Sequence, residues 1–184
     1  MASYFDWLIN ILCKFAYGRI TKLNEYMSNT KLVYHIVIRP KNGVGAIPVE
    51  HERKLYGYMV GMVRQKGGCV IRIGGMPDHV HLLVSLPPTV SISDFVRIIK
   101  TSTNSFLKAN AADFPLFREW SKEYFAVSCS PDSVEGIRQY IMSQKEHHKK
   151  VRFADELQQL ARKFGIELYA PPVTMPRNRS SRAQ

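Results

Sequence analysis

Two histidines separated by a single residue, His79 and His81, stand at the start of a short apolar run. Because side chains alternate along a β-strand, both imidazoles project from one face, whereas Val80 and Leu82 project from the other. Neutral imidazole is the commonest metal ligand in proteins, so two imidazoles on one pleat form half of a divalent-cation site. The spacing alone, however, favours the alternative of two surface histidines that bind no metal.

Further along the chain, Tyr140 and Gln144 are four residues apart in a segment with apolar residues at helical spacing. Residues four apart share one helix face, and Val134, Ile137 and Ile141 mark a neighbouring stripe that can pack on a sheet. A phenol is a latent nucleophile, and an amide oxygen is a ligand for hard cations. Taken singly, each residue is better explained as the rim of an amphipathic helix. Their combination with the histidine pair in a basic chain is what favours chemistry.

The sequence contains 26 Lys and Arg against 15 Asp and Glu, which gives a formal net charge of +11 and an isoelectric point near 9.7. This excess predicts a polyanionic partner, because Lys and Arg bind phosphates without reading base sequence. A run of charges is also often only a solvated face, so each basic residue has a second interpretation. The candidates for contact with such a polyanion are Arg39, Lys41, Arg72, Lys145, His147, His148, Lys149 and Lys150.

The chain has 184 residues, of which 45% are hydrophobic and 22% charged, as expected for one folded domain with appendages. Its three cysteines lack the spacing of a disulfide framework and are predicted to be reduced thiols. The longest apolar stretch, residues 4–17, is interrupted by Asp6, Asn10 and Lys14, so it is too polar to cross a membrane and lacks a basic leader. We therefore expect a cytoplasmic, nucleoid-associated protein without membrane contact.

The apolar patterns predict a β-α-β-β-α-β order followed by a last helix, which is a ferredoxin-like (RRM-like) α+β fold. The predicted elements are strand 32–39, helix 49–66, strands 69–74 and 80–86, helix 91–110, strand 124–129, helix 133–150 and a further helix at 155–164. An antiparallel sheet with helices on one face leaves its other face for a ligand. We divide the chain into an N-terminal extension (1–30), the domain (31–166) and a basic, disordered tail (167–184).

An aromatic connector, which contains Phe114, Phe117 and Trp120, precedes the fourth predicted strand. Aromatic side chains can stack on unpaired bases. Large rings are more often buried, so we favour a place in the core and in a dimer surface.

Three motifs together resemble the HUH single-tyrosine transposases of the smallest bacterial insertion sequences, which include the REP-associated tyrosine transposases. The motifs are residues 75–84 (GMPDHVHLLV), 91–97 (SISDFVR) and 140–148 (YIMSQKEHH), and the resemblance extends over residues 31–166. It implies a metal-dependent endonuclease and strand-transferase that acts on single-stranded DNA through a 5′-phosphotyrosine. The implied metal ligands are His79, His81 and Gln144, the ion is Mg²⁺ or Mn²⁺, and the nucleophile is Tyr140. Asp78 is expected chiefly to form the turn, with support of the histidines as a lesser role.

The resemblance also implies partners. Similar proteins are homodimers that recognise hairpin-forming single-stranded ends, and their tyrosine helix can complete the site of the partner subunit. Two alternatives stay open at this point. The first is a non-catalytic nucleic-acid-binding module of RRM-like fold, which would need exposed aromatic residues on its central strands. The second is a domesticated HUH nuclease that processes chromosomal repeats.

Overall fold

The computed structural model describes residues 30–147, 153–163 and 165–167. The described chain forms two compact units, which divide between Lys150 and Val151. The second unit contains α6 (Phe153–Lys163), close to the helix predicted at 155–164. Most of the predicted N-terminal extension and basic tail lies outside the described residues.

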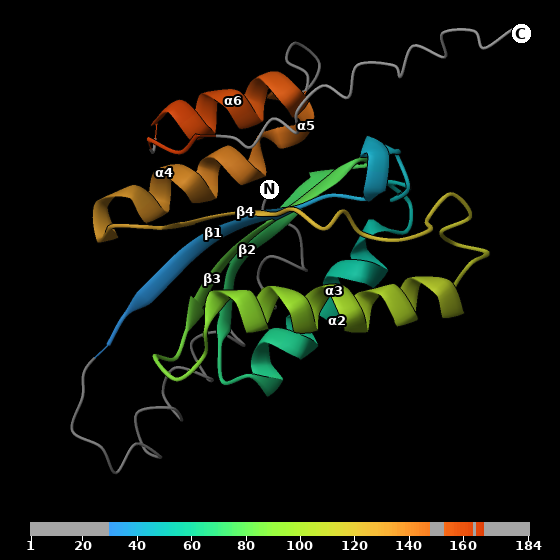
Figure 1. Ribbon diagram of the computed structural model, residues 1–184, viewed down its shortest axis with the longest axis horizontal. Coiled ribbons are helices and arrows are strands. Elements are labelled where there is room, and N and C mark those ends of the chain that lie inside the picture. Colours follow the sequence, from blue (N-terminus) through green and yellow to red (C-terminus); the bar gives the residue numbers. More distant parts are fainter. Residues whose placement is uncertain (1–29, 148–152, 164, 168–184) are drawn as a thin grey trace, which may run out of the picture. The chain divides into compact units, whose positions relative to one another are not determined.

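The first unit has the ferredoxin-like order that the sequence predicts. Its elements are β1 (Leu32–Ile38), a 3₁₀ turn (Lys41–Gly43), α2 (Glu52–Gln65), β2 (Cys69–Met76), β3 (His79–Leu86), α3 (Ile92–Ala109), β4 (Phe125–Ser128), α4 (Pro131–Met142) and α5 (Gln144–His147). The strands form one sheet in the order β2-β3-β1-β4, with every neighbouring pair antiparallel. Each helical crossover therefore joins two parallel strands that have an antiparallel strand between them (Figure 1).

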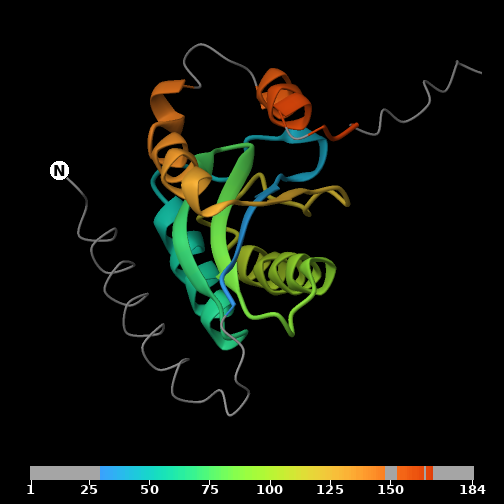
Figure 2. The same ribbon diagram turned by 90° about the vertical axis from the view of Figure 1, so that its left-hand side faces the viewer.

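The register of β1 on β3 assigns the two faces of the sheet. Ile36 pairs with Leu82 and Ile38 with Val80, and these four buried side chains belong to the main core, together with those of α2 and α3. Because side chains alternate along a strand, the side chains of Val37 and of its partner His81 point to the opposite face of the sheet. That second face is not left open as expected, because α4 packs against it while α2 and α3 cover the first (Figures 1 and 2).

Local signals explain where the helices start and stop. The Ser91 hydroxyl accepts a hydrogen bond of 3.2 Å from the backbone N–H of Asp94, as predicted for the start of α3. The chain leaves α2 through Gly67, whose φ of +72° favours glycine. The uninterrupted helix predicted for residues 133–150 is wrong, because the chain breaks at Ser143 between α4 and α5. There the Ser143 hydroxyl donates to the backbone oxygen of Tyr140, which competes with helix continuation.

The aromatic connector belongs to the core rather than to an exposed stacking surface. Phe114, Phe117 and Trp120 are all buried and join the main cluster. The Trp120 indole N–H donates to Thr103 Oγ1 at 2.9 Å, which satisfies its polar atom inside the core. The core interpretation is thereby confirmed, whereas the dimer surface stays a prediction.

Two further expectations concern cysteines and membranes. Cys129 is a free thiol, as predicted, whereas Cys13 lies outside the described residues. Among the described helices, none combines the length and the hydrophobicity needed to span a bilayer.

Candidate functional site

The two histidines of β3 lie side by side on the sheet face that α4 covers. Both are completely buried, at 0% exposure, so the alternative of two surface histidines is wrong. Their ring centroids are 4.9 Å apart and the ring planes are nearly perpendicular, at 85°. The strand parity predicted from the sequence is confirmed, because Val80 and Leu82 lie in the main core on the other face.

Asp78 both forms the turn and contacts a histidine. With Pro77 it links β2 to β3, and its Oδ1 lies 2.8 Å from Nδ1 of His79. A carboxylate at this distance accepts a hydrogen bond from Nδ1–H and holds the imidazole in the tautomer that keeps its lone pair on Nε2. The lesser of the two roles expected for Asp78 is therefore present together with the turn.

A third histidine, which the sequence analysis did not single out, belongs to the same face. His35 on β1 is 1% exposed, and its Nε2 lies 2.9 Å from Nδ1 of His81, with the rings stacked at 19°. In the register His35 is opposite Leu83 and Val37 is opposite His81, so the two histidines are diagonal neighbours. The signal that could have found it is strand parity, since β1 and β3 are adjacent in a ferredoxin-like sheet.

The surroundings of His35 keep it neutral. Burial, and secondarily the nearby His81, lower the pKa of His35 from 6.5 to about 3. A neutral imidazole has one N–H donor and one acceptor nitrogen, so Nε2 of His35 can accept a hydrogen bond from Nδ1–H of His81. His35 thus offers His81 the same kind of contact that Asp78 offers His79.

Tyr140 reaches the histidines from α4. Val134, Ile137 and Ile141 pack this helix on Val33 and Leu83, as the predicted apolar stripe requires. The ring of Tyr140 is partly exposed, and its centroid lies 5.9 Å from that of His81 at an angle of 89°. The phenol therefore stands beside the buried imidazoles of its own chain.

A glycine allows this close approach. A Cβ atom at Gly74 would lie 3.0 Å from Cγ2 and 3.2 Å from the backbone oxygen of Ile141, which is closer than ordinary packing distances. Gly74 pairs with His81 across the β2–β3 ladder. The absence of a side chain at this position is what lets the end of α4 settle on the strand beside His81.

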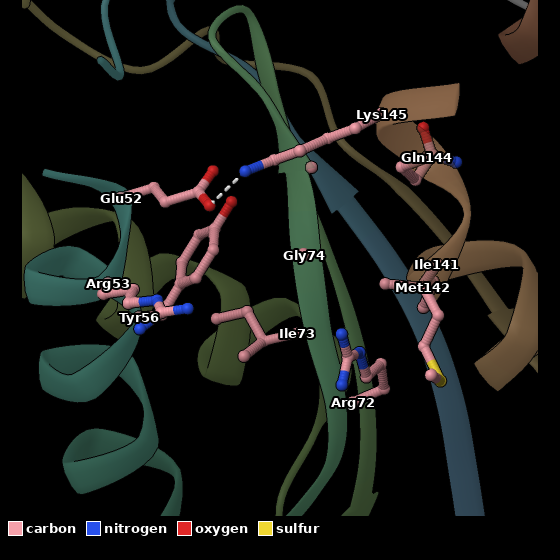
Figure 3. A pocket seen from close by; sticks show the side chains of 11 residues that line it. Glu52, Arg53, Tyr56, Arg72, Ile73, Gly74, Ile141, Met142, Gln144 and Lys145 are labelled. Carbon is pink, nitrogen blue, oxygen red and sulfur yellow. Dashed lines mark hydrogen bonds and ion pairs between the residues drawn. The ribbon is translucent and has the colours of Figure 1, made fainter. Parts of the chain in front are cut away.

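Gln144 is the first residue of α5 and is 1% exposed. Although the break at Ser143 separates it from the helix of Tyr140, it stays near the same place, because it lines a cavity together with Gly74 (Figure 3). His79, His81 and Tyr140 thus lie together, and Gln144 lines the same cavity as Gly74, the partner of His81 in the β2–β3 ladder.

Residues 28–144, which end at this glutamine, match the family described as "Transposase IS200 like". The chain belongs to this family. The ISDra2 transposase TnpA of Deinococcus radiodurans is 28% identical over 123 residues, which cover 63% of this chain and 86% of that protein. The transposase for insertion sequence element IS200 of Salmonella typhimurium is 26% identical over 120 residues, which cover 63% of this chain and 78% of that protein.

Solved structures agree with this membership. A crystal structure of a transposase from Deinococcus radiodurans R1 matches with a TM-score of 0.53 and 26% identity, over 66% of this chain and 96% of that one. A REP-associated tyrosine transposase bound to a REP hairpin matches with a TM-score of 0.52, over 70% of this chain and 76% of that one. The two sequences are 17% identical, so this match shows a common fold. The resemblance inferred from the three sequence motifs is confirmed.

The site of this transposase fits a divalent ion by the chemistry of its donors. Nδ1 of His79 faces Asp78 and Nδ1 of His81 faces His35, so Nε2 is the atom that would coordinate an ion in each. Both Nε2 atoms and Oε1 of Gln144 are buried. Among the described residues, no group of three or more His, Cys, Asp or Glu side chains is arranged to hold a metal. The donor set expected here is a different one, two imidazoles and an amide.

The basic residues predicted to bind DNA lie in several places on the transposase. Arg72 is on β2, on the same face as His81. Lys145 forms an ion pair with Glu52, and Lys41 forms one with Glu119. Arg39 follows β1 and is partly exposed. His147 ends α5, and the remaining candidates, His148, Lys149 and Lys150, lie outside the described residues.

The residues on the central strands also distinguish this protein from an RRM-like binding module. On the face that Tyr140 approaches, β1 presents Val33, His35 and Val37, and β3 presents His79, His81 and Leu83. None of these is Phe, Tyr or Trp, so the two central strands lack, on this face, the stacking residues that an RRM needs.

Proposed function

We propose that this transposase cuts and rejoins single-stranded DNA through a covalent 5′-phosphotyrosine at Tyr140. The observation that supports this most directly is the 5.9 Å separation between the ring centroids of Tyr140 and His81. A phenol beside buried imidazoles is a nucleophile next to groups suited to binding an ion, which is the pairing that phosphodiester cleavage requires.

In the cleavage step, Oη of Tyr140 forms a bond to phosphorus while the bond between phosphorus and O3′ breaks. The phenol loses its proton, and O3′ keeps the electron pair of the broken bond and takes up a proton, which leaves a free 3′-OH. The new phosphate ester conserves the bond energy. A second 3′-OH can therefore reverse the step and join new ends without ATP.

His79, His81 and Gln144 are the proposed ligands of a Mg²⁺ or Mn²⁺ ion. A free tyrosine phenol has a pKa of about 10, so it is mostly protonated at neutral pH. When bound, such an ion would polarise the scissile phosphate and favour the phenolate. The chain's own residues orient the ligands. Asp78 accepts a hydrogen bond from Nδ1–H of His79, and His35 faces Nδ1 of His81.

The proposed substrate is single-stranded DNA with hairpin-forming ends. Support comes from the net charge of +11 and from the fold shared with a REP-associated transposase that was bound to a REP hairpin. Such DNA is found in the cytoplasm at the nucleoid, where we infer that the protein acts. A domesticated nuclease would use the same chemistry, and hairpin ends on both sides of the gene would distinguish a mobile element from it.

The test is incubation of the protein with a labelled single-stranded hairpin oligonucleotide and Mg²⁺ or Mn²⁺, followed by a denaturing gel. We expect a covalent protein–DNA adduct that is lost with chelator and is not formed on double-stranded DNA. Tyr140→Phe should abolish the adduct. Tyr58→Phe is the matched control, because Tyr58 stacks on Phe106 far from the histidines and should leave the adduct intact. An undiminished adduct with Tyr140→Phe would refute the nucleophile.

We infer further that one chain can complete the site, since Tyr140 and His81 meet within the same chain. The homodimer implied by the resemblance stays a prediction. In such a dimer, exchange of α4 between subunits would bring Tyr140 to the histidines of the partner. Gel filtration tests the dimer, and a monomeric mass would contradict it.

A further inference from the structure

A cavity of about 220 Å³ opens at the outer edge of the sheet, beside the proposed site. We call it the edge cavity. Its floor is β2 from Arg72 to Gly75, one wall is the start of α2, and the other is the junction of α4 and α5 (Figure 3). Because β2 is the edge strand of the sheet, backbone N–H groups that do not pair with β3 point toward this side.

The side chains that line the edge cavity are mostly basic. Arg53, Arg72 and Lys145 stand against one acid, Glu52, which gives the lining a net charge of +2. Nε of Arg72 is buried, so this guanidinium is held in the wall and not spread over the surface. Positive side chains along a partly enclosed wall attract an anion more strongly than the same charges in open water.

The acid in the lining is itself neutralised. Lys145 reaches across from α5 to form an ion pair with Glu52, whose side chain is only 13% exposed (Figure 3). Tyr56 also directs its hydroxyl toward Glu52, and burial followed by this carboxylate raises the pKa of Tyr56, so the phenol stays protonated. Glu52 therefore repels an incoming anion less than its charge suggests. The two arginines make the net charge of the cavity lining positive.

The position and size of the edge cavity limit what it can bind. Gln144 and Gly74 line it, and Gly74 pairs with His81, so it begins about one strand spacing, ~4.8 Å, from the histidines. Its volume is below the ~300 Å³ at which pockets for drug-sized ligands begin. A phosphate group with part of its sugar fits such a space better than a whole nucleotide.

We propose that the edge cavity binds one phosphodiester group of the single-stranded DNA beside the bond that is cut, with Arg53 and Arg72 as its cationic partners. This inference rests on the proposed function, because it assigns a place to the same substrate. It adds Arg53, which the sequence did not single out. It also assigns Lys145 to pairing with Glu52 and not to direct contact with DNA.

The test measures binding without chemistry. Fluorescence anisotropy of a labelled single-stranded hairpin oligonucleotide is recorded in EDTA over a range of salt concentrations, with Tyr140→Phe as the parent protein. Adding Arg72→Met or Arg53→Met should weaken binding about fivefold or more at low salt. Each should also reduce the slope of log K against log salt by about 0.7, the value for one phosphate contact on a single strand.

Arg97→Met is the matched control, because Arg97 is exposed on α3 and pairs with Asp94. It should change neither affinity nor slope. If the parent binds the oligonucleotide and both cavity variants bind it equally well with the same slope, the phosphodiester site in the edge cavity is refuted. The proposed function stands in that case. If the parent does not bind single-stranded DNA, both proposals fall. Arg53 is exposed, so its variant gives a result even where Arg72→Met fails to fold.

Discussion

Nε2 of His35 lies 2.9 Å from Nδ1 of His81, although the two residues are 46 positions apart in the chain. One of these nitrogens donates a hydrogen bond to the other, and the direction of that bond decides what His81 can do. If His81 keeps the proton on Nδ1 and donates it to His35, then its Nε2 has the lone pair that a metal requires. We therefore assign His35 as a positioning residue for the proposed metal ligand.

The first prediction concerns this contact. Replacing His35 by Asn removes the acceptor of His81, and we expect the affinity for Mn²⁺ to fall about tenfold or more, as for other outer-shell partners of metal ligands. Titration calorimetry of Mn²⁺ binding is the measurement. The longer amide in His35→Gln can still accept a hydrogen bond from His81, so this variant should recover part of the Mn²⁺ affinity. A merely structural role of His35 predicts no such recovery. The half-exposed His51, replaced by Asn, is the control. Equal Mn²⁺ affinities in wild type and His35→Asn would contradict the assignment.

The second prediction concerns the close approach of α4 to β2. Gly74→Ala places a Cβ within 3.2 Å of the Ile141 backbone oxygen, which must move the end of α4 away from His81. We expect adduct formation to slow by about tenfold to a hundredfold, because small displacements of a reacting group are costly. Unfolding free energy should fall by about 1–3 kcal/mol, as for other overpacked sites.

Gly57→Ala is the matched control for that substitution, since nothing lies within 4 Å of a Cβ at this helical position. It should leave adduct formation unchanged and stabilise the chain by about 0.5–1 kcal/mol, because alanine favours a helix over glycine. Gel kinetics and urea unfolding measure the two effects. Full activity in Gly74→Ala would show that the position of α4 is not critical.

The third prediction concerns the dependence of stability on pH in the metal-free protein. Burial and the nearby His81 lower the pKa of His35 to about 3, against 6.5 in the unfolded chain. Below pH 6.5 the unfolded state binds a proton that the folded state does not, so stability is lost as the pH falls toward 3. Between pH 7 and pH 5 this histidine should cost up to about 2 kcal/mol. Urea unfolding in EDTA measures it, and an equal loss in His35→Asn would rule out His35 as the source.

The fourth prediction distinguishes a site within one chain from a site shared by two. Tyr140→Phe and His81→Ala are each expected to form no adduct. Because the two residues meet in the same chain, a mixture of the two variants should remain inactive. If mixing restores the adduct on a denaturing gel, then α4 is exchanged between the subunits of a dimer. Mixing each variant with wild type serves as the control for subunit exchange and protein quality.

The fifth prediction concerns the segment that leads into β4. Nζ of Lys100 donates to the backbone oxygens of Ser121, Lys122 and Glu123 at 2.9, 3.1 and 2.8 Å. Lys100→Met removes all three donors, and we expect a loss of about 2 kcal/mol in unfolding free energy. The exposed Lys108 of α3, replaced by Met, should cost nothing measurable by the same thermal or urea unfolding. A Lys100→Met protein as stable as wild type would exclude this anchoring role.

Local pattern was sufficient for much of the fold. Alternation along β3 put His79 and His81 on one face, and the capping residue Ser91 marked the start of α3. Both depend only on residues that are neighbours in sequence, because strand parity and helix capping involve short-range geometry. The break at Ser143 also has a local cause, but no Gly or Pro, the usual residues that end a helix, marks it in the sequence.

By itself, the sequence determined the order of the elements, the family, and the four residue types proposed for the chemistry. Only the tertiary structure decided that His35 contacts His81, that Gly74 gives α4 room beside them, and that Arg53 shares a cavity with Arg72. These relationships join segments that are far apart in the chain. They depend on strand register and on the seating of one helix on the sheet, which hydrophobic periodicity does not encode.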